Sequence, residues 1–301
     1  MYIYYTKVKG VFALLLQQVI EKFKEYLDVQ ERSPETISSY MKDLKSFETF
    51  IVTKYNGPVY FSDITAKDID EYLKYLKEER KLSPASRSRN LYTLRSLYNF
   101  ACKKDLCQQN IANKIEPIKI RQKERVYLTP KEVEELVNAI DHFLIKVVVQ
   151  TLYYTGMRIS ECLNLKIDDL DFKNNIIHIK KGKGNKDRDI PINSKLKSIL
   201  QEYWDKERKF IKSPYFFATE KTGRLSSVYV NTVLHQTTDK LNWTKKVTAH
   251  TLRHSFASNL VLNDVSLVNI QRLLGHSNLK ITSIYTHTNM DELSKAVNSL
   301  N

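Results

Sequence analysis

The sequence holds little of what marks a disulfide-bonded, zinc-binding, membrane-bound or disordered protein. Its three cysteines, Cys102, Cys107 and Cys162, are odd in number and match no zinc spacing, which predicts free thiols in a reducing cytoplasm. Glycine and proline occur seven times each, too rarely for a low-complexity chain. The apolar run at residues 11–16 is too short for a membrane span, and glutamines follow it where a signal peptide has small residues. We therefore expect a cytoplasmic chain without a membrane anchor.

Acidic residues are in the minority. Lysine and arginine number 48 against 34 aspartates and glutamates, a formal net charge of +14, and 42% of the residues are hydrophobic, enough for a real core. A folded chain this basic favours a polyanionic partner, with nucleic acid first. The alternative from charge alone is a basic protein from a lysine-rich proteome.

The first third of the chain has the apolar spacing of amphipathic helices. Ser33-Pro34 and Ser83-Pro84 each place an N-cap serine before a proline at the first helical position, and Thr65 begins a capping box. Apolar residues recur at three- and four-residue steps in four stretches. We predict an all-helical domain of four helices over residues 15–110, preceded by an unassigned extension, residues 1–14.

Residues 83–104 contain basic side chains and no acidic ones. Their leucines occupy one face of the predicted helix, which leaves a basic face for DNA phosphates. The alternative is a solvated face, although such a face normally mixes charges of both signs. The candidate DNA contacts are Arg87, Arg89, Arg95, Lys103 and Lys104.

The chain changes character after residue 110. Residues 111–125, with Pro117 and alternating basic side chains, predict an extended linker able to lie along DNA; a solvated surface loop is the alternative. In residues 126–301, strand-forming residues at 176–179 and 187–192 flank a glycine-rich turn and predict a hairpin. The remainder is mostly helical, so we expect a mainly α protein of two domains, the second α+β with a small antiparallel sheet.

Four separated motifs carry the candidate chemistry of the second domain. Arg158 and Glu161 stand three apart, which predicts that they share one helical face, and they follow Gly156, which can end a helix in the left-handed conformation. His250 and Arg253 have the same spacing and share a helical face. Taken alone, Arg158 and Glu161 fit a surface ion pair as well as a catalytic site, and His250 fits a structural histidine as well as a catalytic residue. The other two motifs are the basic hairpin tip at 180–188 and the pair His276 and Tyr285.

Together, these residue types supply what metal-free attack on a phosphodiester requires. Arginines bind non-bridging oxygens in bidentate fashion and offset charge in the transition state. A tyrosine is protonated at neutral pH, so a neighbouring histidine must accept its proton, and a lysine on a hairpin tip can protonate the leaving alkoxide. No carboxylate cluster suggests a two-metal nuclease. We therefore expect no cofactor.

The blocks TGMRISE, KKGKGNKDR, HTLRHSFAS, LGHSN and IYTHT resemble those of the tyrosine recombinase (phage integrase) family, most closely its Xer-like branch. The resemblance spans nearly the whole chain and implies a SAM-like core-binding first domain before a catalytic domain. Glu161 matches a supporting acidic position, which we treat as structural. Two lysines of the basic motif are candidates for the family's general acid, Lys183 and Lys186. Lys183 is preferred because it lies between two glycines, where the family's lysine lies. The implied site comprises Arg158 and Arg253 as phosphate-binding arginines, Lys183 as general acid, His250 as acid/base partner of the tyrosine, His276 as a further phosphate ligand and Tyr285 as nucleophile.

The resemblance also implies a mechanism and partners. The family cuts each strand through a 3′-phosphotyrosyl bond, releases a 5′-hydroxyl and rejoins it to the partner strand without ATP, in DNA integration, excision or resolution. Four protomers act on two double-stranded sites with inverted repeats, as a homotetramer or paired with a related recombinase. Two other functions stay open: DNA relaxation by a type IB topoisomerase-like enzyme, and a non-catalytic DNA-binding regulator, against which the full catalytic set argues.

Overall fold

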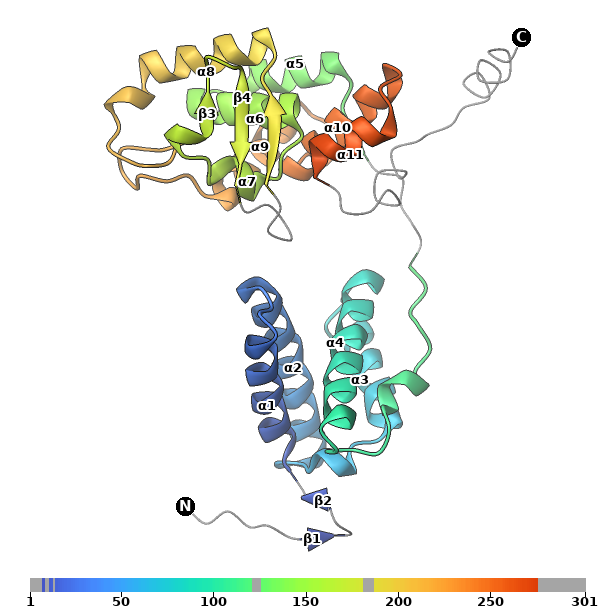
Figure 1. The fold of residues 1–301 in the computed structure, drawn as a ribbon. Coiled ribbons are helices and arrows are strands. Elements are labelled where there is room, and N and C mark those ends of the chain that lie inside the picture. Colours follow the sequence, from blue (N-terminus) through green and yellow to red (C-terminus); the bar gives the residue numbers. More distant parts are fainter. Residues whose placement is uncertain (1–6, 9–10, 13, 121–125, 181–186, 276–301) are drawn as a thin grey trace, which may run out of the picture. The chain divides into compact units, whose positions relative to one another are not determined.

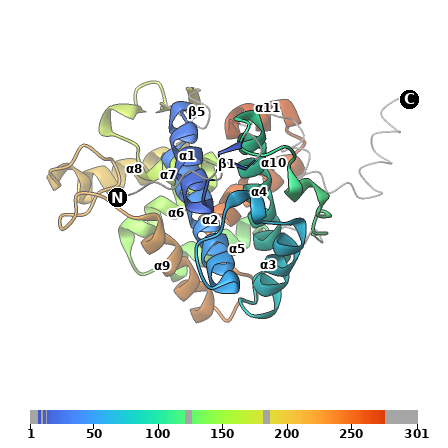
Figure 2. The same cartoon turned by 90° about the horizontal axis from the view of Figure 1, so that it is seen from below.

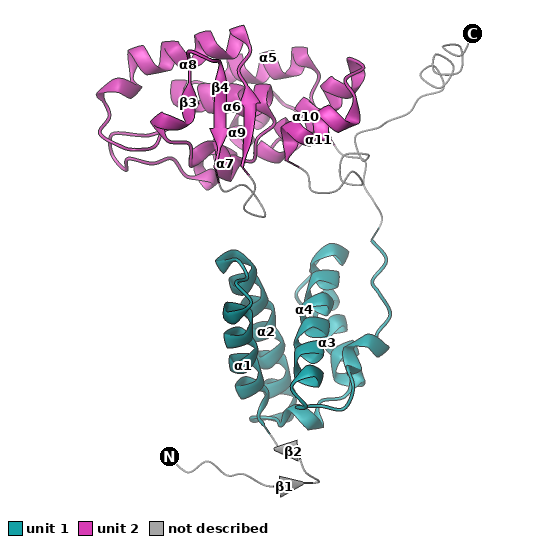
Figure 3. Ribbon diagram, in the orientation of Figure 1, with its two compact units in different colours: residues 1–123 teal, residues 124–301 magenta. Residues whose placement is uncertain are grey.

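The structure is a computed structural model, which describes residues 7–8, 11–12, 14–120, 126–180 and 187–275. The chain divides into two compact units, residues 1–123 and 124–301 (Figure 3). Within the described residues, no helix is both long and apolar enough to span a bilayer. Each unit is described by itself below.

The first unit is built on four helices that pack side by side (Figures 1 and 2). The predicted caps are confirmed, because the hydroxyls of Ser33, Thr65 and Ser83 each accept a hydrogen bond from the backbone three residues on. The core is apolar and aromatic, with Phe47 and Tyr72 in edge-to-face contact at its centre. The helices are α1 (Leu16–Val29), α2 (Pro34–Tyr55), α3 (Ala66–Glu78) and α4 (Pro84–Lys103).

Short elements precede, connect and follow the helices of this unit in the chain. Strands β1 (Lys7–Val8) and β2 (Val11–Phe12) form a small antiparallel ladder before α1, and a 3₁₀ turn, η1 (Phe61–Asp63), joins α2 to α3. After α4, the segment predicted as a linker begins with a second 3₁₀ turn, η2 (Ile111–Lys114). Its buried residues, Ala112 and Ile115, belong to the core of the helical unit.

The second unit surrounds one apolar helix. Helix α6 is buried on most of its surface and contacts α5, α7, α8 and α10, so it forms the centre of the unit's core. The helices are α5 (Pro130–Ala139), α6 (Phe143–Thr155), α7 (Ile159–Leu163), α8 (Ser194–Lys206), α9 (Ser227–Lys240), α10 (Ala249–Leu262) and α11 (Leu267–Leu274), with 3₁₀ turns η3 (Ile167–Asp169) and η4 (Arg208–Phe210).

A three-stranded antiparallel sheet of order β3-β4-β5 completes this unit. The predicted hairpin is confirmed as β4 (Ile176–Ile179) and β5 (Arg188–Pro191), with Ile177 opposite Ile190 and both buried. The third strand, β3 (Leu170–Asp171), was not predicted. The expected fold class, mainly α with a small antiparallel sheet in the second domain, is confirmed. Strand β5 contacts α11, which brings the hairpin to the end of that helix.

Candidate active site

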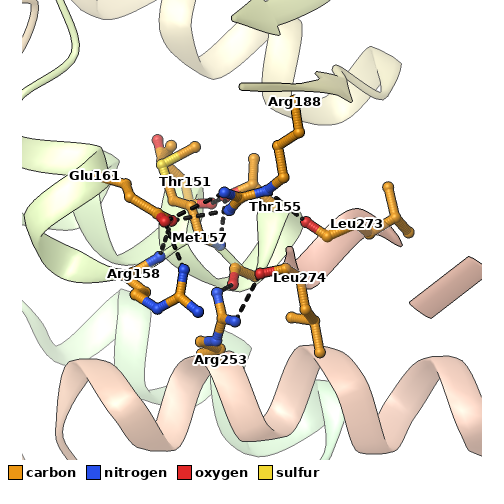
Figure 4. Close-up of polar contacts among 10 residues, drawn as sticks. Thr151, Thr155, Met157, Arg158, Glu161, Arg188, Arg253, Leu273 and Leu274 are labelled. Carbon is orange, nitrogen blue, oxygen red and sulfur yellow. Dashed lines mark hydrogen bonds and ion pairs between the residues drawn. The ribbon is translucent and has the colours of Figure 1, made fainter. Parts of the chain in front are cut away.

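The turn between α6 and α7 presents Arg158. Helix α6 ends at Gly156, whose φ of 61° is left-handed, as the sequence predicted. A Cβ at this position would lie 2.2 Å from Cδ1 of Phe256, so the turn packs closely on α10. Beneath it, the Thr155 hydroxyl donates to the carbonyl of Thr151 (Figure 4). The chain leaves the turn extended and reaches α7 one residue after Arg158.

Arg158 and Glu161 interact through the start of α7. The prediction that both residues share one helical face is wrong in detail, because Arg158 is extended and precedes the helix as its N-cap. Glu161 is the third residue of α7, and its carboxylate accepts two hydrogen bonds from Arg158. The Arg158 backbone N–H donates to Oε2 and the Arg158 Nη1 donates to Oε1, each at 2.7 Å. The carboxylate thereby fixes both the backbone and the guanidinium of Arg158.

Arg253 joins three elements around the site. Both His250 and Arg253 lie in the first turns of α10, as predicted. The Arg253 side chain is buried, and its Nη1 and Nη2 donate to the carbonyl oxygens of Gly156 and Leu274 at 2.6 and 2.7 Å (Figure 4). Helix α10 is therefore tied to the turn before Arg158 and to the end of α11.

Arg188, the last residue of the basic motif at 180–188, also belongs to this cluster, although it was not predicted as a site residue. It begins β5, and its two terminal nitrogens donate to the Glu161 carboxylate at 3.2 and 2.8 Å. Its Nε donates to the Leu273 carbonyl at 3.0 Å. Burial alone would raise the pKa of Glu161, but hydrogen bonds from Arg188 and Arg158 outweigh it and hold the pKa at about 2. Glu161 is therefore ionised at neutral pH.

His250 is exposed at the start of α10, next to the two arginines. Loss of solvation by the surrounding protein, together with the charges of Arg253 and Arg158, lowers the pKa of His250 below its ordinary 6.5. Its imidazole is therefore mostly neutral at pH 7 and able to accept a proton. The structure thus brings together Arg158, His250 and Arg253, three of the six predicted catalytic residues.

The other predicted catalytic residues, Lys183, His276 and Tyr285, lie outside the described residues, as does the competing Lys186. Their places in the chain still relate them to the cluster. Lys183 belongs to the segment between β4 and β5, a few residues before Arg188 in the chain. His276 follows Gly275, whose left-handed φ of 66° caps the end of α11. Among the described residues, no three His, Cys, Asp or Glu side chains gather as a metal site would require.

The five predicted DNA contacts of α4 differ in their surroundings. Arg89 pairs with the buried Asp43 at 2.6 Å, and Arg95 donates to the backbone carbonyls of Ala112 and Ile115, which holds η2 against the helix. Arg87 is half-buried, whereas both lysines are exposed. DNA contact by Arg87, Arg89, Arg95, Lys103 and Lys104 stays a prediction.

Known proteins resemble the chain over nearly its whole length. A tyrosine recombinase of Pseudothermotoga lettingae is 32% identical over 294 residues, covering 95% of this chain and 99% of that one. The tyrosine recombinase XerC of Bacillus subtilis is 31% identical over 291 residues, covering 92% and 94%. Among solved structures, XerH recombinase bound to its difH substrate in a pre-cleavage complex is 26% identical with a TM-score of 0.70, covering 95% of this chain and 84% of that one.

The sequence profiles of two families match in the order of the two units. The N-terminal SAM-like domain of phage integrases matches residues 20–105, from within α1 to just beyond the end of α4. The phage integrase family itself matches residues 126–292, more than half of the chain and the part that carries the arginine cluster. Profiles, relatives and fold agree: the chain belongs to the phage integrase family, the tyrosine recombinases.

Proposed function

We propose that the chain cuts and rejoins DNA strands at specific sites through a covalent bond between Tyr285 and the 3′-phosphate. Family membership makes it a site-specific DNA recombinase. The observation that carries the proposed chemistry is the convergence of Arg158, His250 and Arg253 at one place in the second unit. Neither DNA relaxation nor regulation without catalysis is favoured by the relatives, which are recombinases by name.

The two arginines bind the scissile phosphate in this proposal. Arg253 donates to the backbone carbonyls of Gly156 and Leu274, and Arg158 donates to Glu161. These bonds fix the arginines before DNA arrives, so their charge stabilises the transition state with little reorganisation. His276, which follows Gly275 at the end of α11, is the further phosphate ligand.

Proton transfers complete the step. The Tyr285 oxygen attacks phosphorus, and its proton passes to the neutral imidazole of His250. The bond from phosphorus to the 5′-oxygen breaks, and Lys183 gives that oxygen a proton. Rejoining runs the same transfers in reverse, with a 5′-hydroxyl of the partner strand as nucleophile. The phosphotyrosyl bond conserves the energy of the phosphodiester, so no ATP is consumed.

The same proposal assigns roles to the two units and to partners. Residues 15–110 form the core DNA-binding domain and residues 126–301 the catalytic domain. Residues 111–125 form the linker, whose first part packs on the helical domain through Ala112 and Ile115. The substrate is a double-stranded site with inverted repeats, bound in the cytoplasm by a tetramer of this chain or by this chain with a related recombinase. A structure of XerH, a similar protein, contains its difH substrate, which supports a duplex of defined sequence as partner.

Trapping the covalent intermediate tests this function. The protein is incubated with a pool of nicked genomic duplexes, and denaturant-resistant complexes are recovered and their DNA is sequenced. The wild type is expected to form complexes with one recurrent inverted-repeat sequence, in EDTA as well. Tyr285→Phe should form none while its gel-shift affinity stays near wild type, since only the nucleophilic oxygen is lost. Tyr229→Phe, at an exposed tyrosine of the same unit, is the matched control.

Three outcomes would contradict the proposal in different ways. An undiminished complex in Tyr285→Phe would move the nucleophile to another tyrosine. A chemical step that needs a metal ion would reject the arginine-based mechanism. Recovered DNA without a common sequence would favour relaxation over site-specific exchange.

A further inference from the structure

Arg188 connects three segments of the candidate active site. Its side chain is 11% exposed and belongs to β5, the strand that follows the residues carrying Lys183. One end of the guanidinium faces Glu161, 27 residues earlier, and the other faces the Leu273 carbonyl, 85 residues later (Figure 4). In the same cluster, Arg158 contacts α7 through Glu161, and Arg253 contacts the end of α11 and the turn before Arg158.

The charges of this group decide what Arg188 can do. Glu161 is 8% exposed and lies 2.7 Å from the Arg158 guanidinium. A buried carboxylate paired with Arg158 alone would cancel most of the positive charge that a phosphate needs, because nearby charges interact strongly where water is excluded. With Arg188 at 2.8 Å on the same carboxylate, the three groups sum to one positive charge. Glu161 can then orient Arg158 without neutralising it.

The end of α11 provides a second, independent contact. The last carbonyls of a helix have no N–H partner within the helix and carry partial negative charge. Arg188 donates to the Leu273 carbonyl, and Arg253 to that of Leu274. The left-handed Gly275 leaves room for the Arg188 guanidinium, since a Cβ there would lie 2.9 Å from Nη1. Arg188 thus packs against the backbone immediately before His276.

We propose that Arg188 is a positioning residue for strand cleavage, which balances the charge of Glu161 so that Arg158 keeps its own charge for the scissile phosphate. Arg188 acts through Glu161 and does not itself contact DNA. Its bond to α11 holds the same group against the segment that leads to His276. This inference rests on the proposed function, because it concerns the rate of phosphotyrosyl formation.

The test compares the single-turnover rate of adduct formation at saturating DNA with DNA affinity and thermal unfolding. Arg188→Gln leaves Glu161 to Arg158 alone and should slow the adduct more than about tenfold, with a change in Kd below about threefold. The double variant Arg188→Gln/Glu161→Gln removes both charges and should recover most of that loss. Asp189→Asn, which breaks an exposed pair with His178 in the same strand, is the matched control and should match wild type.

The double variant separates charge balance from packing. If Arg188 were merely structural, the double variant would form the adduct as slowly as Arg188→Gln or more slowly, and this result would overturn the proposal. A wild-type rate in folded Arg188→Gln would overturn it as well. If Arg188→Gln does not fold, Arg188→Lys replaces it in the test, because lysine keeps the positive charge. The proposal is also overturned if folded Arg188→Lys forms the adduct no faster than Arg158→Gln. Absence of a wild-type adduct instead rejects the proposed function, and this inference with it.

Discussion

Nη1 of Arg253 lies 2.6 Å from the carbonyl oxygen of Gly156, a residue 97 positions earlier in the chain. The bond joins α10 to the turn that presents Arg158, and the Arg253 side chain is buried where the two elements meet. A residue proposed to bind phosphate is therefore also part of the packing of the unit. Changes in this turn should alter stability and cleavage together.

Gly156→Ala should be strongly destabilising, because it adds two costs at one position. The left-handed φ of 61° strains an L residue, and the new Cβ would lie 2.2 Å from Phe256 and 2.9 Å from Leu274. Together we expect a loss of about 2–4 kcal/mol in the free energy of unfolding. Gly223→Ala is the control, since Gly223 has the same φ but its nearest side chain, Ser213, is 3.8 Å away. Equal losses in urea unfolding would remove the packing argument.

His250 should titrate below pH 6.5 in the DNA-free protein. Loss of solvation and the charges of Arg253 and Arg158 lower the pKa of its imidazole. Because the folded-state pKa is depressed, the charged form is disfavoured and becomes populated only as the pH falls further. The imidazole proton signals, assigned with His250→Asn, give the midpoint by NMR. Arg158→Gln should move that midpoint upward; a midpoint above 6.5 in the wild type would contradict the neutral-base assignment.

Asp68 should make the first unit sensitive to acid. Burial would raise the pKa of its carboxyl, but hydrogen bonds from Lys54 and Thr65 hold it at about 2, below the ordinary 3.8. The stabilisation is therefore present above about pH 4 and is lost as the pH falls toward 2. At pH 7, Asp68→Asn should cost about 2 kcal/mol in the free energy of unfolding, and less at pH 3. Asp141→Asn, at an exposed pair with Lys240, should cost little at either pH.

Local signals in the sequence were sufficient for much of the fold. The caps at Ser33, Thr65 and Ser83 and the left-handed Gly156 depend on neighbours a few residues away, so each was predicted correctly. Strand β3 is only two residues long, too short for any alternation to show. The second domain's hairpin was found because its turn and strands lie together in the chain.

Long-range contacts explain what the sequence could not predict. Arg188 meets Glu161 and Leu273 across 27 and 85 residues, and no local spacing signals such a contact. Arg95 appeared equivalent to the other basic residues of α4 until the fold showed its bonds to Ala112 and Ile115. The residue types of the site were predictable because phosphate chemistry requires them; their partners depend on how distant elements pack.

Lys103 and Lys104 give the cleanest test of DNA binding by α4, because both are exposed. If each displaces a counterion from a phosphate, Lys103→Gln/Lys104→Gln should lower the slope of log K against log salt by about 2. Lys22→Gln/Lys24→Gln removes two exposed charges from α1 and should change the slope less. Gel shifts over a salt series provide the measurement. The same loss in both variants would indicate a general charge effect without a specific role for α4.

Lys183 is predicted to be the general acid, and sulfur substitution can isolate that role. Guanidinium groups hardly deprotonate, so Arg158 and Arg253 cannot readily replace a lysine that donates a proton to the 5′-oxygen. Lys183→Ala should therefore cut cleavage strongly on an ordinary phosphodiester. With sulfur at the bridging 5′ position, the leaving thiolate is a far weaker base and needs no proton. The variant should then recover most of its rate.

Two further variants decide how that recovery is interpreted. Arg158→Ala should stay slow on the sulfur substrate, because its loss affects the phosphate and not the leaving group. Lys186→Ala distinguishes the two lysines of the segment between β4 and β5. Recovery of Lys186→Ala but not of Lys183→Ala would move the acid to Lys186 and keep the mechanism. Recovery of neither would show that this segment does not supply the proton, and the acid would have to come from another part of the site.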